Sequence, residues 1–131
     1  KDKKDKKDKK DKKDKKTPEV HKLASGLTYQ DIVIGSGPPV RQGRQLSMRY
    51  QGMLENGKVF DGNTPRGRPF NFTLGAGEVI QGWDQGIVGM RVGGRRTLLI
   101  PPELGYGRGG SPPQIPPNAS LIFSVEILKM K

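Results

Sequence analysis

The sequence predicts a small α+β domain in which an antiparallel sheet of five or six strands wraps around one short helix, preceded by a disordered Lys/Asp tail. Three observations lead to this prediction. A chain of 131 residues is long enough for one hydrophobic core but not for two. Short β-prone runs alternate with turns in a chain that carries 19 Gly and 11 Pro. A single segment has apolar residues at helical spacing.

The first residues differ sharply from the rest in composition. Residues 1–16 hold eleven Lys and five Asp and no apolar residue, so this segment has no face to bury. We therefore divide the chain into a basic tail over 1–16, a linker over 17–26 and a folded domain over 27–131. A flexible lysine tract attracts phosphates and acidic protein segments, and basic runs also serve as nuclear-import signals. The tail is therefore expected to serve nuclear targeting or to contact acidic partners, with nucleic acid as one candidate partner of Lys1–Lys16.

The predicted strands are short runs of apolar and β-branched residues that end at glycine or proline. Alternation of apolar and polar residues is clearest at 46–51, which indicates a strand with one buried face. Asn56-Gly57 is typical of a tight turn between two strands. The six predicted strands lie at 27–34, 46–51, 59–60, 70–74, 95–100 and 121–128.

The predicted helix runs from about Val79 to Met90, where apolar residues recur at spacings of three and four. Gly82 and Gly86 lie inside it and weaken its intrinsic propensity. Residues 101–119 form a long Gly/Pro-rich loop without predicted regular structure. A loop of this length in a small domain is usually functional.

The composition excludes several classes of protein. Without cysteine the chain has no disulfide and no Cys-ligated metal site, and its one histidine, His21, is expected to be an exposed chain residue. No apolar run approaches the roughly 20 residues of a membrane span, so we expect a soluble intracellular domain with no membrane association. Outside the tail, no two of the eight acidic residues form an evident acid/base pair. An enzyme of this composition would catalyse a reaction that needs neither a nucleophile nor a proton shuttle.

Rotation about an X–Pro peptide bond is a reaction of this kind. Its barrier of about 18–20 kcal/mol arises because rotation breaks amide resonance. An apolar pocket that holds the proline ring and removes water would lower this barrier, helped by a few polar groups matched to the twisted amide.

Five segments of the sequence resemble the FKBP family of tacrolimus-binding peptidyl-prolyl isomerases. They occur in the family's order and cover about Leu27 to Lys129. The segments are Y-Q-G-M-L-E-N-G-K-V-F-D at 50–61, R-P-F-N-F-T-L-G at 68–75, E-V-I-Q-G-W-D-Q-G-I-V-G-M at 78–90, P-P-E-L-G-Y-G at 101–107 and I-P-P-N-A-S-L-I-F-S-V-E-I-L at 115–128. The resemblance implies an antiparallel sheet around one helix and an isomerase that needs no metal and no cofactor.

The resemblance also implies a set of site residues. The expected catalytic residues are Asp61, Tyr106, Trp83, Phe60 and Phe123. The expected residues for binding substrate and drug are Tyr50, Phe60, Asp61, Arg66, Phe70, Glu78, Val79, Ile80, Trp83, Tyr106, Ile115 and Phe123. Trp83 would form the floor of the pocket, and Asp61 would interact with Tyr50 or Arg66. The Ile80 N–H would bind a ligand carbonyl, and Glu78 would contribute mainly its own carbonyl.

Two residues depart from the family's usual pattern. Ser111 stands where small family members often have histidine, and Gln114 stands where a branched aliphatic residue is common. Both lie on the loop expected over the pocket, so they bear on substrate preference and drug affinity.

The resemblance implies proline-containing peptides, tacrolimus and rapamycin as ligands of a monomeric domain. Family members with basic tracts before a C-terminal isomerase domain include nuclear and nucleolar proteins associated with chromatin and histones, and by this resemblance the chain looks like the C-terminal domain of one of them. We therefore expect nuclear or nucleolar localisation, otherwise cytoplasmic, with histones as further candidate partners of Lys1–Lys16.

Two other hypotheses remain open from the sequence. In the first, the domain is a binding or chaperone module for proline-containing segments, and catalytic turnover of the X–Pro bond is incidental. Alternatively, the lysine tail and a face formed by Arg95 and Arg96 would bind nucleic acid directly.

Overall fold

The computed structural model describes residues 19–63 and 67–131. The tail predicted over 1–16, the first two residues of the predicted linker, and Arg66 lie outside these described residues. No helix in the described ranges is long and apolar enough to cross a membrane. The elements are β2 (Val20–Lys22), β3 (Thr28–Val33), β4 (Gln45–Leu54), β5 (Val59–Gly62), β6 (Phe70–Thr73), α1 (Gln81–Gly86), β7 (Arg95–Ile100), the 3₁₀ helix η2 (Pro102–Leu104) and β8 (Leu121–Met130).

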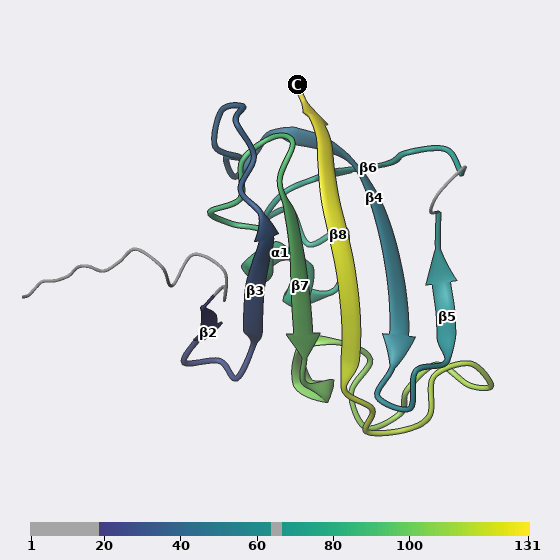
Figure 1. Ribbon diagram of the computed structural model, residues 1–131. Coiled ribbons are helices and arrows are strands. Elements are labelled where there is room, and N and C mark those ends of the chain that lie inside the picture. The colour runs from purple at the N-terminus through teal and green to yellow at the C-terminus, as the bar shows by residue number, and fades with distance from the viewer. Residues whose placement is uncertain (1–18, 64–66) are drawn as a thin grey trace, which may run out of the picture.

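The strands form one antiparallel sheet in the order β2-β3-β7-β8-β4-β5 (Figure 1). Strand β6 pairs with the first half of β4, and β5 pairs with its second half. The predicted α+β class, with an antiparallel sheet around one short helix, is confirmed. Counted over the described residues, the sheet has seven strands rather than five or six. The additional strand, β2, lies within the predicted linker and pairs with β3 through Val20–Lys22.

One face of the sheet supplies most of the core. Along β4, Leu46 and Met48 are fully buried while Gln45 is exposed, as the alternation predicts. Buried residues of β7 and β8 lie on the same face, including Leu98 and Ile127. Helix α1 lies on one face of the sheet (Figure 1) and buries Trp83 at 5% exposure. We call this face of the sheet the inner face and the opposite one the outer face.

Helix α1 is shorter than the predicted span of Val79 to Met90. It covers six residues, and Gly89 beyond it has a φ of +94°, which a right-handed helix does not allow. Close packing of α1 against β7 requires glycine at two positions of the helix. A Cβ on Gly82 would lie 2.6 Å from Ile100 atoms, and one on Gly86 would lie 2.9 Å from Leu98. The helix therefore lies too close to the sheet for any larger residue at these positions.

Arg96 joins the helix to the sheet, which corrects its predicted place on a nucleic-acid-binding face. It is 3% exposed, and its Nη1 donates to the carbonyl oxygens of Gly86 and Val88 at 2.8 and 3.0 Å. Its Nε and Nη2 donate to the Asp31 carboxylate at 2.7 and 3.3 Å, and its guanidinium carbon lies 4.0 Å from the centre of the Tyr29 ring. Arg96 is thus buried and held by partners within the fold.

The hairpin of β2 and β3 makes a further contact between the sheet and helix α1. The His21 ring stacks on Tyr29 with centroids 4.9 Å apart, and 44% of the His21 side chain is exposed. Ser25, between β2 and β3, donates to Gln85 of α1 at 2.8 Å. The segment predicted as a linker therefore contacts both the sheet and the helix.

Candidate active site

A cavity of about 400 Å³ opens on the inner face of the sheet. It draws residues from β4, β5, β6, β8, α1, the segment that precedes α1 and the loop that follows η2. The lining residues are Tyr50, Asp61, Phe70, Glu78, Val79, Ile80, Trp83, Tyr106 and Phe123. All nine belong to the set that the sequence predicted for this site.

Trp83 is the centre of an aromatic cluster at the base of the cavity. Its ring lies edge-to-face against Tyr50 at 4.9 Å, Phe123 at 5.2 Å and Phe70 at 5.7 Å, measured between centroids. These three rings come from three different strands, so the sheet fixes their positions around the indole. Edge-to-face rings of this kind form a rigid apolar wall suited to an aliphatic ring.

Two aromatic residues support this cluster from behind. Phe72 is 2% exposed and lies 6.0 Å from Trp83, a position that the sequence did not assign to the site. Phe60 was predicted as a catalytic residue, but it does not line the cavity and instead lies edge-to-face against Phe123 at 5.6 Å. Gly52 makes this arrangement possible, because a Cβ there would lie 2.5 Å from Phe123 and 2.9 Å from Phe60.

The polar edge of the cavity centres on Asp61. Its Oδ2 accepts a hydrogen bond from the Tyr50 hydroxyl at 3.0 Å, and its Oδ1 accepts one from the Gly62 N–H at 2.8 Å. Burial, followed by the hydrogen bond to Asp61, raises the pKa of Tyr50 to about 12. Burial, with the Asp61 charge second, also raises the pKa of Tyr106. Both phenols therefore remain protonated donors across the neutral pH range.

Glu78, Val79 and Ile80 form one wall of the cavity. Two carboxylates hold this wall in place by accepting hydrogen bonds from backbone N–H groups of the segment before it. Asp84 of α1 accepts hydrogen bonds from the N–H groups of Gly75 and Gly77 at 2.8 and 3.1 Å. Glu78 Oε1 accepts one from the Thr73 N–H at 2.9 Å. Asp84 was not among the predicted site residues, although it follows Trp83 directly in one of the five segments.

Asn63 also supports the site and was not predicted. Its Oδ1 accepts a hydrogen bond from the Tyr50 N–H at 2.8 Å, and its Nδ2 donates to the carbonyl oxygens of Met48 and Arg68 at 3.1 and 2.9 Å. These bonds tie β4, next to Tyr50, to the segment that leads into Phe70.

Ile115 was predicted to bind ligand and lies elsewhere. It is 4% exposed within the hydrophobic core and is absent from the cavity lining. Its N–H and carbonyl form a pair of hydrogen bonds with Ser111, which close a tight turn over 111–115. The two departures from the family pattern, Ser111 and Gln114, both belong to this turn and do not line the cavity. Arg66 lies outside the described residues.

The fold and the site define a small sheet-and-helix domain with an aromatic cavity on the inner face of its sheet. Residues 37–128 match a family model described as FKBP-type peptidyl-prolyl cis-trans isomerase. The chain belongs to this family, and it carries an isomerase domain of the FKBP type.

Individual relatives agree with this assignment. The chain is 53% identical over 113 residues to FK506-binding protein 4 of Rhizopus delemar, a match that covers 86% of this chain and 29% of that protein. It is 46% identical over 114 residues to the 46 kDa FK506-binding nuclear protein of Spodoptera frugiperda, which covers 86% and 27%. The chain therefore spans less than a third of the length of these relatives.

Solved structures show the same fold. The crystal structure of AtFKBP13 matches with a TM-score of 0.80 at 44% identity, covering 86% of this chain and 99% of that one. The crystal structure of FkpA from Escherichia coli matches with a TM-score of 0.78 at 41% identity, covering 86% and 51%.

Proposed function

We propose that the aromatic cavity binds the proline ring of a polypeptide and catalyses cis–trans isomerisation of the preceding peptide bond. One observation carries this proposal. The cavity has an apolar aromatic floor on Trp83 and a carboxylate, Asp61, that is already hydrogen-bonded by Tyr50. This arrangement supplies burial and fixed polar groups, which are what rotation about an amide requires.

Desolvation is the first contribution to catalysis. The planar amide is more polar than the twisted one because resonance separates charge in the planar form, so water stabilises the ground state more than the transition state. Rings from Tyr50, Phe70 and Phe123 around Trp83 exclude water from one side of the bound proline. The barrier to rotation falls as a result.

Fixed polar groups make the second contribution. The Ile80 N–H has no acceptor among the described residues, and it lies on the cavity wall, where it can donate to a substrate carbonyl. The Tyr106 hydroxyl stands on the opposite loop and binds the peptide chain. Asp61 lies beside the rotating amide and interacts with the twisted form. Glu78 offers its carbonyl, since its carboxylate is engaged by Thr73.

The same cavity is expected to bind tacrolimus (FK506) and rapamycin. The names of the relatives from Rhizopus delemar and Spodoptera frugiperda describe binding of FK506. A cavity of about 400 Å³ is of the size that drug-like molecules occupy. The domain is expected to act as a monomer and without a cofactor.

Exchange NMR on a short X–Pro peptide, with and without tacrolimus, tests the proposed activity. We expect accelerated cis–trans exchange that tacrolimus abolishes. A folded protein that binds tacrolimus but leaves the exchange rate unchanged would contradict catalysis and favour a module that only binds proline-containing segments.

The lysine tail suggests where the domain acts. We propose a nuclear protein, because one relative is named a nuclear protein and Lys1–Lys16 provides a salt-sensitive contact for chromatin components. Deletion of residues 1–16 is expected to abolish association with DNA or histones while leaving isomerisation unchanged. Association that persists after deletion, or that is indifferent to salt, would exclude this role for the tail.

A further inference from the structure

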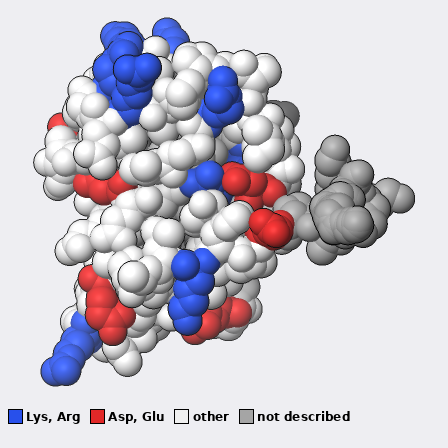
Figure 2. All heavy atoms as spheres, turned by 90° about the vertical axis from the view of Figure 1, so that its left-hand side faces the viewer, with Lys and Arg blue, Asp and Glu red and all other residues white. Residues whose placement is uncertain are grey.

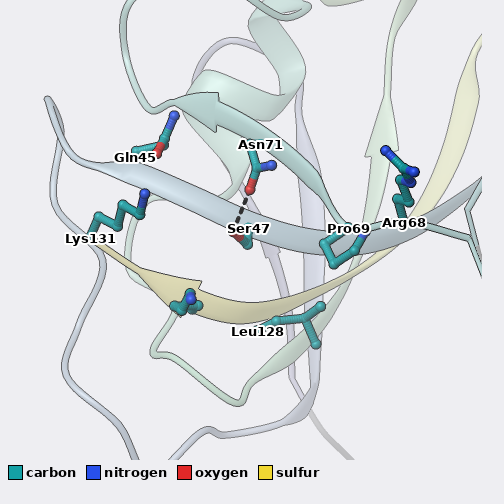
Figure 3. A pocket seen from close by; sticks show the side chains of 8 residues that line it. Gln45, Ser47, Arg68, Pro69, Asn71, Leu128 and Lys131 are labelled. Carbon is teal, nitrogen blue, oxygen red and sulfur yellow. Dashed lines mark hydrogen bonds between the residues drawn. The ribbon is translucent and has the colours of Figure 1, made fainter.

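A second hollow lies on the outer face of the sheet, away from the aromatic cavity. It is a groove of about 530 Å³ where the ends of β4, β6 and β8 meet. Figure 3 shows Arg68 and Lys131 at opposite ends of the groove, with Ser47, Pro69 and Leu128 between them. The complete lining is Gln45, Ser47, Arg68, Pro69, Asn71, Leu128, Lys129 and Lys131. We refer to these eight residues as the outer groove.

A β-bulge in β8 produces the basic side of the outer groove. Ser47 pairs with Lys129, but the next residue of β4, Met48, pairs with Ile127, so Leu128 is the extra residue. Strict alternation after Ile127, which is buried, would turn Lys129 and Lys131 toward the core. The bulge instead places Leu128, Lys129 and Lys131 together on the outer face, while Met130 packs against the core.

Hydrogen bonds hold the groove in a defined shape. Ser47 and Asn71 are opposite each other on β4 and β6, and their side chains are hydrogen-bonded (Figure 3). The Lys131 N–H donates to the Gln45 carbonyl at 2.9 Å, and Arg44 Nε donates to the backbone oxygen of Lys131. The basic side chains therefore project from backbone whose position is fixed by β4.

Within the described part of the chain, the cationic side chains of the outer groove have no acidic partner. In the ranges 19–63 and 67–131, no carboxylate lies within ion-pair distance of Arg68, Lys129 or Lys131. Glu126 shares the outer face of β8, but its carboxylate lies 3.9 Å from Arg95. Figure 2 views the β2 and β3 side of the molecule, where Lys and Arg gather toward the end from which the C-terminus emerges in Figure 1 and Asp and Glu lie mostly nearer the middle and the other end. The groove offers three cations to an outside ligand.

We propose that the outer groove binds an acidic peptide segment, with its carboxylates on Arg68, Lys129 and Lys131 and an apolar side chain over Leu128 and Pro69. The fork of an arginine matches a carboxylate, and lysines add point charges on either side. The amides of Gln45 and Asn71 can pair with a peptide backbone. The polar and apolar lining together therefore suits a short stretch of acidic polypeptide.

The lining favours peptide over nucleic acid. Single-stranded nucleic acid is usually bound by aromatic side chains that stack on the bases, and none of the eight lining residues is aromatic. The outer groove also lies on the opposite face of the sheet from the aromatic cavity, since Ser47 and Asn71 alternate with Met48 and Phe70. An acidic segment and a proline-containing segment can therefore be bound at the same time.

NMR titration of the isotope-labelled full chain with a short peptide of glutamates around one leucine tests the proposal residue by residue. We expect salt-sensitive shifts of the amides of 45–47, 68–71 and 128–131. Replacing Arg68→Gln together with Lys129→Gln should weaken binding at these amides about tenfold, as loss of two close charge pairs does. The matched control, Lys22→Gln with Lys58→Gln, removes the same charge from exposed positions outside the groove and should leave the affinity nearly unchanged.

Several outcomes would overturn the proposal. One is a set of shifts confined to Lys1–Lys16. Equal weakening by the two double variants would show attraction by net charge alone. A short oligothymidine that fills the groove more tightly than the peptide would assign it to nucleic acid. Inorganic phosphate that binds as well as the peptide would reduce it to a site for small anions. Retained isomerisation by both variants would show that the proteins remain folded and that the result is separate from the aromatic cavity.

Discussion

The Tyr50 hydroxyl donates a hydrogen bond to Asp61 Oδ2 at 3.0 Å across the neighbouring strands β4 and β5. Tyr50 also contacts Trp83 and Phe70 through its ring, so one side chain serves both the polar edge and the aromatic floor of the cavity. The position of the Asp61 carboxylate is therefore linked to the packing of the aromatic cluster.

Replacing Tyr50→Phe should keep this packing and remove the hydrogen bond. A hydrogen bond contributes about 0.5–1.5 kcal/mol, so we expect kcat/KM for isomerisation to fall roughly threefold to tenfold. Exchange NMR on an X–Pro peptide measures this change. Tyr29→Phe, outside the cavity, is the control and should retain full activity. Equal activity of the two variants would show that the hydrogen bond to Asp61 does not contribute.

The raised pKa of Tyr50 should make the stability of the fold depend on pH in the alkaline range. Its pKa is 10.0 in the unfolded chain and about 12 in the folded domain, so between these values the unfolded state has lost a proton that the folded state keeps. The free energy of unfolding should therefore fall as the pH rises from 10 to 12. Urea denaturation across this range measures the slope, which should be shallower in Tyr50→Phe. An unchanged slope in that variant would assign the effect to other groups.

Asp84 is expected to control ligand affinity from outside the cavity lining. The two carboxylate oxygens of Asp84 accept hydrogen bonds from the N–H groups of Gly75 and Gly77. Asp84→Asn turns one of these oxygens into an NH₂ donor, so one bond is lost and the segment that leads to Val79 and Ile80 is held less firmly. Loss of about 1.4 kcal/mol corresponds to tenfold weaker tacrolimus binding. The single tryptophan, Trp83, lines the cavity, so its fluorescence reports binding. Glu126→Gln, on the outer face, should bind tacrolimus normally, and equal affinities would contradict a positioning role for Asp84.

Adjacent arginines in β7 should differ strongly in their effect on stability. Arg96→Met leaves Asp31 without its partner and the Gly86 and Val88 carbonyls without a donor, and loss of one member of a buried pair costs about 3–5 kcal/mol. Arg95→Met removes an exposed pair with Glu126 and should cost less than about 1 kcal/mol. Urea denaturation compares them. Similar urea midpoints for the two variants would contradict a stabilising role for the hydrogen bonds that Arg96 makes between the sheet and the helix.

The sequence was most informative where a pattern was long or specific. The alternation along β4 predicted its buried face, and the five family-like segments predicted all nine residues of the cavity lining. β2 was missed because Val20–Lys22 has only three residues, all exposed, and therefore shows no alternation. The helix was predicted too long because Val79, Ile80 and Met90 are apolar, although Gly89 requires a left-handed backbone conformation.

Other features depend on partners that are distant in sequence. Arg96 looked like a surface residue because its acceptors lie on α1 and on β3, which only the fold brings to it. Ile115 is buried because the turn closed by Ser111 folds it inward. The bulge at Leu128 cannot be predicted from periodicity, since it shifts the period itself.

The position of β8 in the sheet bears on how the protein is made. β8 is the last strand of the domain, yet it lies between β7 and β4 and is the hydrogen-bonded link that joins β2, β3 and β7 to β4, β5 and β6. While a ribosome is still synthesising the chain, these two groups of strands have no common partner. The sheet can close only after the segment through Met130 has left the ribosome, so folding follows synthesis of the domain instead of accompanying it. Until then the two groups keep unpaired strand edges, which are the sites at which an incomplete sheet pairs with other chains.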